Sequence, residues 1–263
     1  MSFESIVGKF EFVKDYKENP ILRASFNELA GKTFGLDFEA WYRAGFWGED
    51  YIPYSAVENG RVVANVAVNH MRFCKDGKER FYLQLGTVMT DKEYRNRGLS
   101  RRLMEWIFEE YEGKVDGIYL FANDSVLDFY PRFGFRQVKE YQYYKKFHLT
   151  GAGEESLADN ENSWKADLQR KVRKVCLEMP EDWKDFGEKI KNYHTQGCFT
   201  NNNLGLLMFY ASGFFKDSVY YIEKLDVYAI AELESEVLVL YEIYAKAEIT
   251  PEKVAACFGG NGG

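Results

Sequence analysis

The 263-residue sequence has few of the residues that build metal centres and disulfide frameworks. Its four cysteines occur singly, none of them in a Cys-x-x-Cys pair, and its three histidines are scattered. Neither residue type has the spacing of a zinc site, so we expect no metal. Free thiols are typical of a reducing compartment, and we therefore expect a cytoplasmic protein.

Long apolar runs and an excess of basic residues are also missing. No apolar segment is long enough to span a bilayer, and the N-terminal residues lack the basic start and apolar run of a signal peptide. We therefore expect no membrane association. The net charge of −7 disfavours nucleic-acid binding, because an acidic chain repels phosphates. A cationic small molecule or a basic peptide would be attracted instead.

One short segment departs from this acidic background. Between Asp91 and Arg102 the basic residues are Lys92, Arg95, Arg97, Arg101 and Arg102. We expect this segment to join a strand to the start of a helix, whose free N–H groups and partial positive charge attract anions. Gly98 would let a ligand approach the backbone closely. Judged by charge alone, a pyrophosphate site and a solvated basic helix end fit equally well.

Two motifs resemble those of the GNAT acetyltransferase superfamily. Arg95-x-x-Gly98-x-Ser100 resembles the family's Arg/Gln-x-x-Gly-x-Gly/Ala signature, with a small serine in place of the usual Gly or Ala. The segment 123–135 resembles the later motif, an Asn followed by Phe/Leu-Tyr-x-x-x-Gly-Phe. The order of expected helices and strands over residues 3 to 147 is also similar to that of the family.

The resemblance implies acetyl-CoA as the acyl donor. It places the pantetheine arm along the strand before the loop and near Asn123, and the pyrophosphate on the loop. The cofactor-binding residues are then Met89, Thr90, Arg95, Arg97, Gly98, Leu99, Ser100, Arg101 and Asn123.

Tyr130 lies where the family places its general acid. A thiolate leaves when an amine attacks the thioester, and a tyrosine, with a pKa of about 10, protonates it only when held close. The alternative is that Tyr130 is a core aromatic beside its phenylalanine neighbours. Both motifs together favour the catalytic role.

No sequence motif identifies the residues of the acceptor site. The family's acceptor pocket is formed by its first helices and by the strands beside the donor arm, which here implicates Phe34, Glu39, Trp41, Tyr42, Phe46, Trp47 and Gln84. The aromatic rings of this set would either hold a cationic amine by cation–π contact or pack the core. Candidate bases are Gln84, Glu39 and Asp37, with a backbone-held water as the alternative.

The predicted fold is α/β, a mixed and mostly antiparallel twisted sheet flanked by helices, followed by a smaller α/β GNAT-like domain. We expect the first domain at residues 1–150, a polar linker at 151–162 and the second domain at 163–263.

In the first domain, turns at Asn59-Gly60 and Asp76-Gly77 separate three antiparallel strands. A helix after the basic loop has the apolar face Leu99, Leu103, Met104, Ile107, Phe108 and Tyr111. A strand at 117–122, a short helix at 125–132 and a long strand region at 135–148 follow. In the second domain we expect a helix from 163 to 175, then a meander.

The sequence predicts an N-acetyltransferase that transfers acetyl from acetyl-CoA to a primary amine of a small molecule or peptide. Because no second Arg-x-x-Gly loop exists, we expect no second CoA site in residues 163–263. One alternative is a non-catalytic acyl-CoA sensor or partner-binding module. Another is a tandem-GNAT aminoacyl or other acyltransferase, although its bulky tRNA donor would require a broad basic face. The sequence does not identify the amine acceptor, and it does not decide between a monomer and a homodimer.

Overall fold

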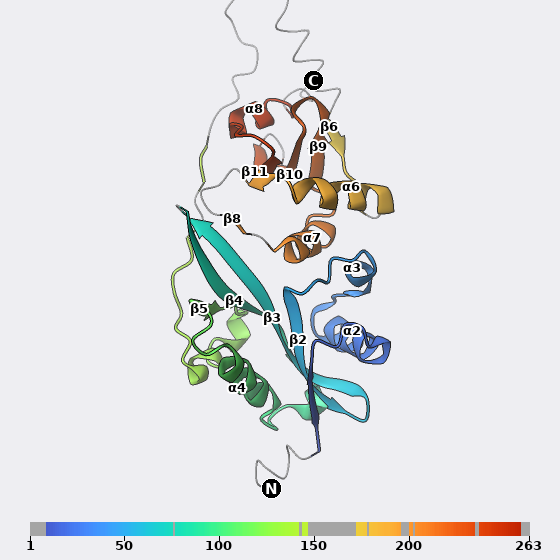
Figure 1. Cartoon of the computed structure of the whole chain (residues 1–263), viewed down its shortest axis with the longest axis vertical. Coiled ribbons are helices and arrows are strands. Elements are labelled where there is room, and N and C mark those ends of the chain that lie inside the picture. The colour runs from blue at the N-terminus through green and yellow to red at the C-terminus, as the bar shows by residue number, and fades with distance from the viewer. Residues whose placement is uncertain are drawn as a thin grey trace, which may run out of the picture. The chain divides into compact units, whose positions relative to one another are not determined.

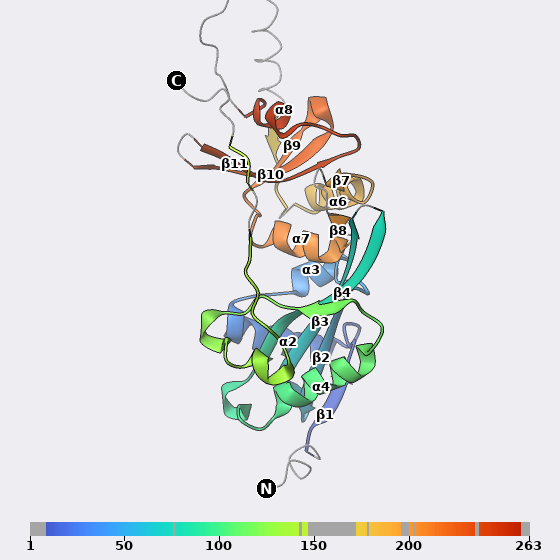
Figure 2. The same cartoon turned by 90° about the vertical axis from the view of Figure 1, so that its left-hand side faces the viewer.

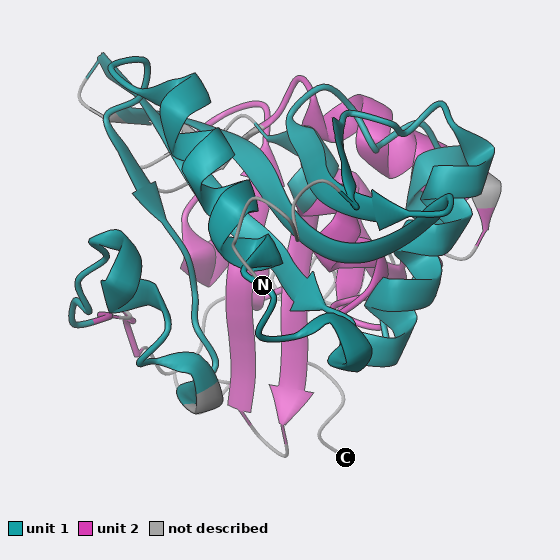
Figure 3. Ribbon diagram, turned by 90° about the horizontal axis from the view of Figure 1, so that it is seen from below, with its two compact units in different colours: residues 1–139, 201–206 teal, residues 140–200, 207–263 magenta. Residues whose placement is uncertain are grey.

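The structure is a computed structural model, and it describes residues 9–75, 77–141, 144–146, 172–177, 179–195, 200–201, 203–234 and 237–258. The chain divides into two compact units (Figure 3). Unit 1 comprises residues 1–139 and 201–206, and unit 2 comprises 140–200 and 207–263. The expected linker at 151–162 lies outside the described residues.

Unit 1 is built on a mixed, mostly antiparallel sheet with the strand order β1-β2-β3-β4-β5, and β8 also pairs with β3. The strands are β1 (Glu11–Lys14), β2 (Tyr51–Glu58), β3 (Arg61–Lys75), β4 (Lys78–Thr90), β5 (Gly117–Tyr119) and β8 (Thr200–Asn201), of which Asn201 alone belongs to unit 1. The expected hairpin between β2 and β3 is confirmed. Asn59 and Gly60 both have positive φ, at 52° and 75°, which a type I′ turn requires.

Helices cover both faces of this sheet (Figure 1). On one face lie α2 (Pro20–Phe34) and α3 (Glu39–Arg43), and on the other lies α4 (Leu99–Tyr111). Figure 2 views the second face and shows α4 running across the strands. The asparagine before Pro20 begins α2, because its side chain accepts hydrogen bonds from the N–H groups of Ile21 and Leu22.

The core of unit 1 under α4 confirms the helix predicted after the basic loop. Leu99, Leu103, Met104 and Ile107 are at most 3% exposed and pack on the sheet. Their spacing puts them on one helical face, as expected for an amphipathic helix on a sheet. This packing places the first turn of α4 beside the end of β4, where the candidate site lies.

Two expected strands of unit 1 are absent or short. The strand expected at 117–122 ends at Tyr119, and residues 135–141 and 144–146 form no strand. Val138 is 81% exposed, so no neighbouring strand buries it. Apolar residues form a strand only where a partner supplies backbone hydrogen bonds, and sequence does not reveal that partner. The helix expected at 125–132 is instead two 3₁₀ turns, η2 (Asp124–Val126) and η3 (Tyr130–Phe133).

Unit 2 contains a five-stranded sheet with the order β6-β9-β10-β11-β7, in which the described pairs are antiparallel. The strands are β6 (Val172–Lys174), β7 (His194–Thr195), β9 (Val219–Ile222), β10 (Val227–Glu234) and β11 (Val237–Ala245). The helices are α6 (Pro180–Ile190), α7 (Leu204–Ser212), whose first three residues belong to unit 1, and α8 (Pro251–Ala255).

The helix expected from 163 to 175 is wrong at its C-terminal end. Residues 172–174 form β6, which pairs with β9 and places Val172 opposite Ile222. The pairing with a strand far along the chain overrides the local helical pattern. Residues 163–171 lie outside the described part of the chain. Within the described ranges, every helix is too short or too polar to cross a bilayer.

Candidate active site

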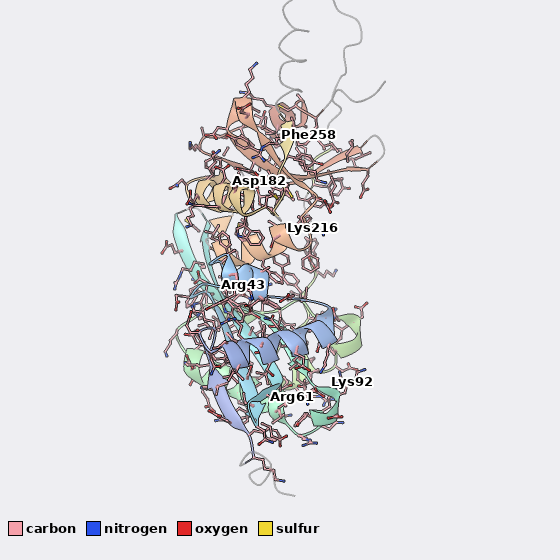
Figure 4. The ribbon with its side chains drawn as sticks, turned by 90° about the vertical axis from the view of Figure 1, so that its right-hand side faces the viewer. Arg43, Arg61, Lys92, Asp182, Lys216 and Phe258 are labelled. Atoms are coloured by element: carbon pink, nitrogen blue, oxygen red, sulfur yellow. The ribbon has the colours of Figure 1, made fainter. Side chains whose placement is uncertain are left out.

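The predicted phosphate loop joins β4 to α4. Asp91 holds the start of this loop: its N–H donates to Val63 O at 2.9 Å, and its carboxylate pairs with Arg61 Nη2 at 2.5 Å. Figure 4 labels Arg61 and Lys92 at this end of unit 1. The 3₁₀ turn η1 (Lys92–Tyr94) follows. These two contacts anchor the start of the loop to β3.

Two residues with positive φ shape the end of the loop. Asn96 has a φ of 61° and Gly98 a φ of 79°. Gly98 is the N-cap of α4 and supplies no side chain, so the N–H groups of Leu99, Ser100 and Arg101 have no intrahelical partner and no cap. These three amides and the helix dipole form the kind of site that binds phosphate groups.

The side chains of Arg95, Arg97 and Arg101 have no carboxylate partner among the described residues, whereas Arg102 Nη1 lies 3.6 Å from Glu109 Oε1. Arg95 Nε and Arg97 Nη2 donate to the backbone oxygens of Thr90 and Glu93, at 3.4 and 2.8 Å. Arg101 lies 5.4 Å from the centre of the Phe133 ring. All three side chains are exposed. Their positive charge is therefore available to an anionic ligand.

Ser100 departs from the family's usual small residue, and its hydroxyl has a role in the structure. Its Oγ lies 2.7 Å from Thr90 Oγ1, so the two hydroxyls form a hydrogen bond. This bond ties the first turn of α4 to the last residue of β4.

The end of β4 that leads into this loop has an open edge. β5 pairs in parallel with β4 only at Tyr82–Gln84, whereas β4 continues to Thr90. Met89 and Thr90 pair with β3 on the other side. The backbone N–H and C=O groups of residues 85–90 therefore lack a strand partner among the described residues on one side of β4. An extended ligand that carries amides can form hydrogen bonds with them, as an added strand would.

A bulge at Thr87, which sequence reasoning missed, interrupts this same stretch. Asn65 pairs with Met89 and Ala67 with Gly86, so β4 carries one extra residue. Thr87 has a φ of 42°, an outlier for a β-branched residue. A glycine inside a strand pattern, here Gly86, was the available signal.

A buried hydrogen-bond network holds the bulge in place. Asn65 Nδ2 donates to Thr87 O at 2.9 Å and lies 3.3 Å from Thr87 Oγ1, and the Tyr51 hydroxyl lies 2.8 Å from the same Oγ1. Ser55 Oγ in turn donates to Asn65 Oδ1 at 2.9 Å. Strained backbone of this kind persists only where its surroundings over-determine it, and it is concentrated at functional sites.

Tyr130 lies in the core that packs α4 on the sheet, together with Leu85 and Leu99. It is 9% exposed, and its hydroxyl has no hydrogen-bond partner among the described residues. Burial raises the pKa of Tyr130 above its usual value of 10. Asn123, in contrast, is exposed and makes no side-chain capping bond at the start of η2.

The predicted acceptor aromatics separate into two groups. Trp41 and Trp47 are 3% and 4% exposed and stack on each other with a centroid distance of 5.7 Å, within a cluster that includes Phe26, Phe38 and Tyr51. These rings pack the face of the sheet opposite α4. Phe34, at 40% exposed, lies at the end of α2, and Phe46 is half-buried.

The carboxylate candidates are engaged with other groups. Glu39 accepts from Arg23 Nε at 2.9 Å and from Arg43 Nε at 3.0 Å, and the hydrogen bond from Arg23 lowers its pKa. Asp37 Oδ1 accepts from the N–H of Glu39 at 2.8 Å. Tyr42 donates to Glu18 and stacks under the Arg23 guanidinium. These contacts support the helices and leave Glu39 a weakened base.

Gln84 is the acceptor candidate on the sheet itself. It is 8% exposed, and its Oε1 is buried without a hydrogen-bond partner within the described ranges. No group of three or more His, Cys, Asp and Glu residues in the described part of the chain is arranged to hold a metal ion.

The open strand, the loop and Tyr130 lie in a segment that a family model matches, whereas the acceptor candidates from Phe34 to Trp47 precede it. Residues 49–137 match the acetyltransferase (GNAT) domain. The matched segment of this GNAT domain begins before β2 and ends after η3, so it contains the open strand, the loop and Tyr130. The description of this family model indicates acetyl transfer. No curated protein matches the chain.

Several solved structures are similar to about half of the chain. An acetyltransferase from Trypanosoma brucei is 19% identical, with a TM-score of 0.40, over 52% of this chain and 99% of its own. A predicted acetyltransferase with acetyl-CoA from Clostridium acetobutylicum is 16% identical, with a TM-score of 0.43, over 52% and 96%. Glucosamine-6-phosphate N-acetyltransferase from Arabidopsis thaliana is 19% identical, with a TM-score of 0.40, over 53% and 99%.

Proposed function

We propose that the protein is an N-acetyltransferase that moves acetyl from acetyl-CoA to a primary amine of a small molecule or peptide. The observation that carries this proposal is the open edge of β4 at residues 85–90, which the loop at 91–98 connects to the uncapped start of α4. The pantetheine arm of acetyl-CoA would lie along the open strand, and its pyrophosphate would lie at the start of the helix.

The residues present fit acetyl-CoA. The amides of Leu99, Ser100 and Arg101 would hold the pyrophosphate, with Arg95 and Arg97 supplying exposed positive charge nearby. The backbone of Met89 and Thr90, with Asn123, would hold the pantetheine arm. Acetyl-CoA, when bound, supplies the acetyl group as an activated thioester.

The chain would assist the transfer by positioning and by proton donation. Backbone N–H groups at the Thr87 bulge would polarise the thioester carbonyl, since donors fixed before reaction stabilise charge that develops on oxygen. Tyr130 would donate its phenolic proton to the departing sulfur. Its raised pKa keeps it protonated at neutral pH, as a general acid must be. Binding both substrates side by side would supply the rest of the acceleration.

Calorimetry with acetyl-CoA, followed by thiol release on a panel of primary amines, tests the proposal. We expect saturable binding and CoA release that depends on the amine. Absence of acetyl-CoA binding would contradict the whole assignment. Tight binding with no turnover on any amine would favour a non-catalytic acyl-CoA sensor.

A further inference from the structure

Two residues paired across neighbouring strands of unit 1 each have a buried amide oxygen without a donor in the described part of the chain. Asn69 on β3 and Gln84 on β4 are paired directly across the two strands and are 3% and 8% exposed. Neither Asn69 Oδ1 nor Gln84 Oε1 has a hydrogen-bond partner among the residues that the structure describes. A buried acceptor without a donor is costly and rare, so the pair indicates a place for a donor from outside the chain.

The residue two positions after Gln84 is a glycine, which adds no side chain beside the pair. Gly86 follows Gln84 on the same face of β4, and a methyl group at Gly86 would lie 3.3 Å from Asn69 Nδ2. A side chain at this position would therefore crowd the amide. A glycine inside a strand often marks a close approach of another group.

The pair also lies beside the strained part of the strand. Thr87, with its φ of 42°, comes directly after Gly86, and the open edge of β4 begins at residue 85. A donor group at Asn69 and Gln84 would thus be next to the backbone where the proposed function puts the thioester.

The surroundings of the pair are aromatic. Tyr51 on β2 pairs with Asn69, and its ring packs with Phe38, Trp41 and Trp47. The carboxylate of Glu39, on α3 above this face, is held by two arginines. Uncharged oxygens among aromatic rings suit a neutral N–H donor on an apolar body better than a polycation, because burying an unpaired charge among them would be costly.

We propose that Asn69 Oδ1 and Gln84 Oε1 accept the N–H hydrogen bonds of the acceptor, a primary monoamine with an apolar or aromatic body. This inference rests on the proposed function. The amine lone pair forms the bond to the acetyl carbon and the carbon–sulfur bond breaks. Tyr130 protonates the sulfur, and the proton lost by the nitrogen passes through water to restore Tyr130. Both oxygens are buried, so the side chains that cover them would have to move for the amine to enter.

The single variants Gln84→Leu and Asn69→Leu test this inference in the full chain. Leucine keeps much of the volume and removes the oxygen. With 2-phenylethylamine as the probe at saturating acetyl-CoA, we expect the KM of the amine to rise about tenfold, the effect of losing one hydrogen bond. We expect calorimetry to give an unchanged acetyl-CoA Kd. The melting temperature should be unchanged or raised in Gln84→Leu, because the substitution removes an unpartnered buried acceptor.

Tyr54→Phe is the matched control. Tyr54 is fully buried on β2, on the face that packs against α4, and its variant should leave the amine KM unchanged. A normal amine KM in both leucine variants, with a lowered melting temperature, would show that the oxygens hold a structural water and would overturn the inference. A tenfold preference for spermidine over 2-phenylethylamine would overturn the proposed substrate class. A protein that binds acetyl-CoA but acetylates no amine refutes the proposed function itself, which separates the two failures.

Discussion

Both units contain a long antiparallel strand that runs through a short connection into a helix, but only one of the two connections is suited to an anion. In unit 1, α4 begins after Gly98 with its first amides uncapped. In unit 2, α8 begins at Pro251, which has no N–H, and Thr250 Oγ1 accepts from the N–H of Lys253 at 3.4 Å. Glu252 adds a negative charge to this first turn. The same order of strand, connection and helix therefore leaves the first helical N–H groups free in unit 1, whereas in unit 2 one is missing at proline and another is bonded to the Thr250 hydroxyl.

The strand edges differ in the same way. In unit 1, β5 pairs with the early part of β4, at Tyr82–Gln84, and leaves the end near α4 open. In unit 2, β7 pairs with β11 at Tyr244 and Ala245, the end nearest α8. A strand partner thus covers in unit 2 the position that an extended ligand would take in unit 1.

The basic residues after the two strands also differ in their partners. Lys246 follows β11 directly and donates to Asp226 Oδ2 at 2.8 Å. This bond, with that from Tyr193, lowers the pKa of Asp226 to about 2. Arg95, Arg97 and Arg101 have no such carboxylate among the described residues. A ligand site therefore depends on which donors and charges the fold leaves unpaired, and the order of helices and strands does not determine it.

The largest effect is expected for Gly98→Glu. The substitution puts a carboxylate at the uncapped helix start and forces a non-glycine residue into a φ of 79°, which costs roughly 1–2 kcal/mol. We expect the acetyl-CoA Kd, measured by calorimetry, to rise at least about a hundredfold. Thr250→Glu is the matched control at the start of α8 and should leave that Kd unchanged. Normal binding by Gly98→Glu would show that the loop is misassigned.

Tyr130→Phe should lower kcat by about a hundredfold while sparing acetyl-CoA affinity, since general acid catalysis contributes roughly that much. Because burial raises the pKa of Tyr130 above 10, the wild-type rate should fall from loss of this proton only above about pH 10. The variant should lack that fall. Stopped-flow thiol release across pH measures both. Tyr141→Phe, at a residue 70% exposed, is the control. An unchanged kcat at every pH would remove Tyr130 from the mechanism.

Asn65→Ala should have an intermediate effect, because it removes both contacts of Asn65 with Thr87 and leaves Ser55 without its acceptor. We expect a loss of about 1–3 kcal/mol in the free energy of unfolding and a kcat lowered roughly tenfold. Urea unfolding and steady-state rates measure these changes. In unit 2, Asn192→Ala removes a comparable but exposed side-chain bond to Glu188 O and should cost less than about 0.5 kcal/mol. Equal effects of the two variants would contradict a special role for the bulge.

Ser100→Ala should have the smallest effect. It removes one hydroxyl bond to Thr90, and the amides that would hold the pyrophosphate remain. We expect a change of less than about threefold in the acetyl-CoA Kd and a loss of about 0.5–1.5 kcal/mol in stability. A loss of affinity beyond tenfold would mean that the Ser100 hydroxyl itself contacts the ligand.

Local patterns were sufficient for several features of unit 1. The Asn59-Gly60 turn follows from the backbone conformations that these two residues tolerate, and α4 follows from its apolar spacing. The connection from strand to helix at Gly98 could also be predicted from local sequence. Its glycine and basic residues are neighbours along the chain, so the pattern does not depend on distant strands. The site residues drawn from the family motifs remain predictions.

Features that depend on distant strands were decided by tertiary structure alone. The missing strand at 135–141 and the appearance of β6 at 172–174 depend on which strand lies alongside, and short sequence patterns carry no such information. The strain at Thr87 exists because Asn65 and Tyr51, on two other strands, hold it. The unpartnered oxygens of Asn69 and Gln84 likewise arise from strand register, since hydrogen-bond satisfaction is a property of neighbours in space.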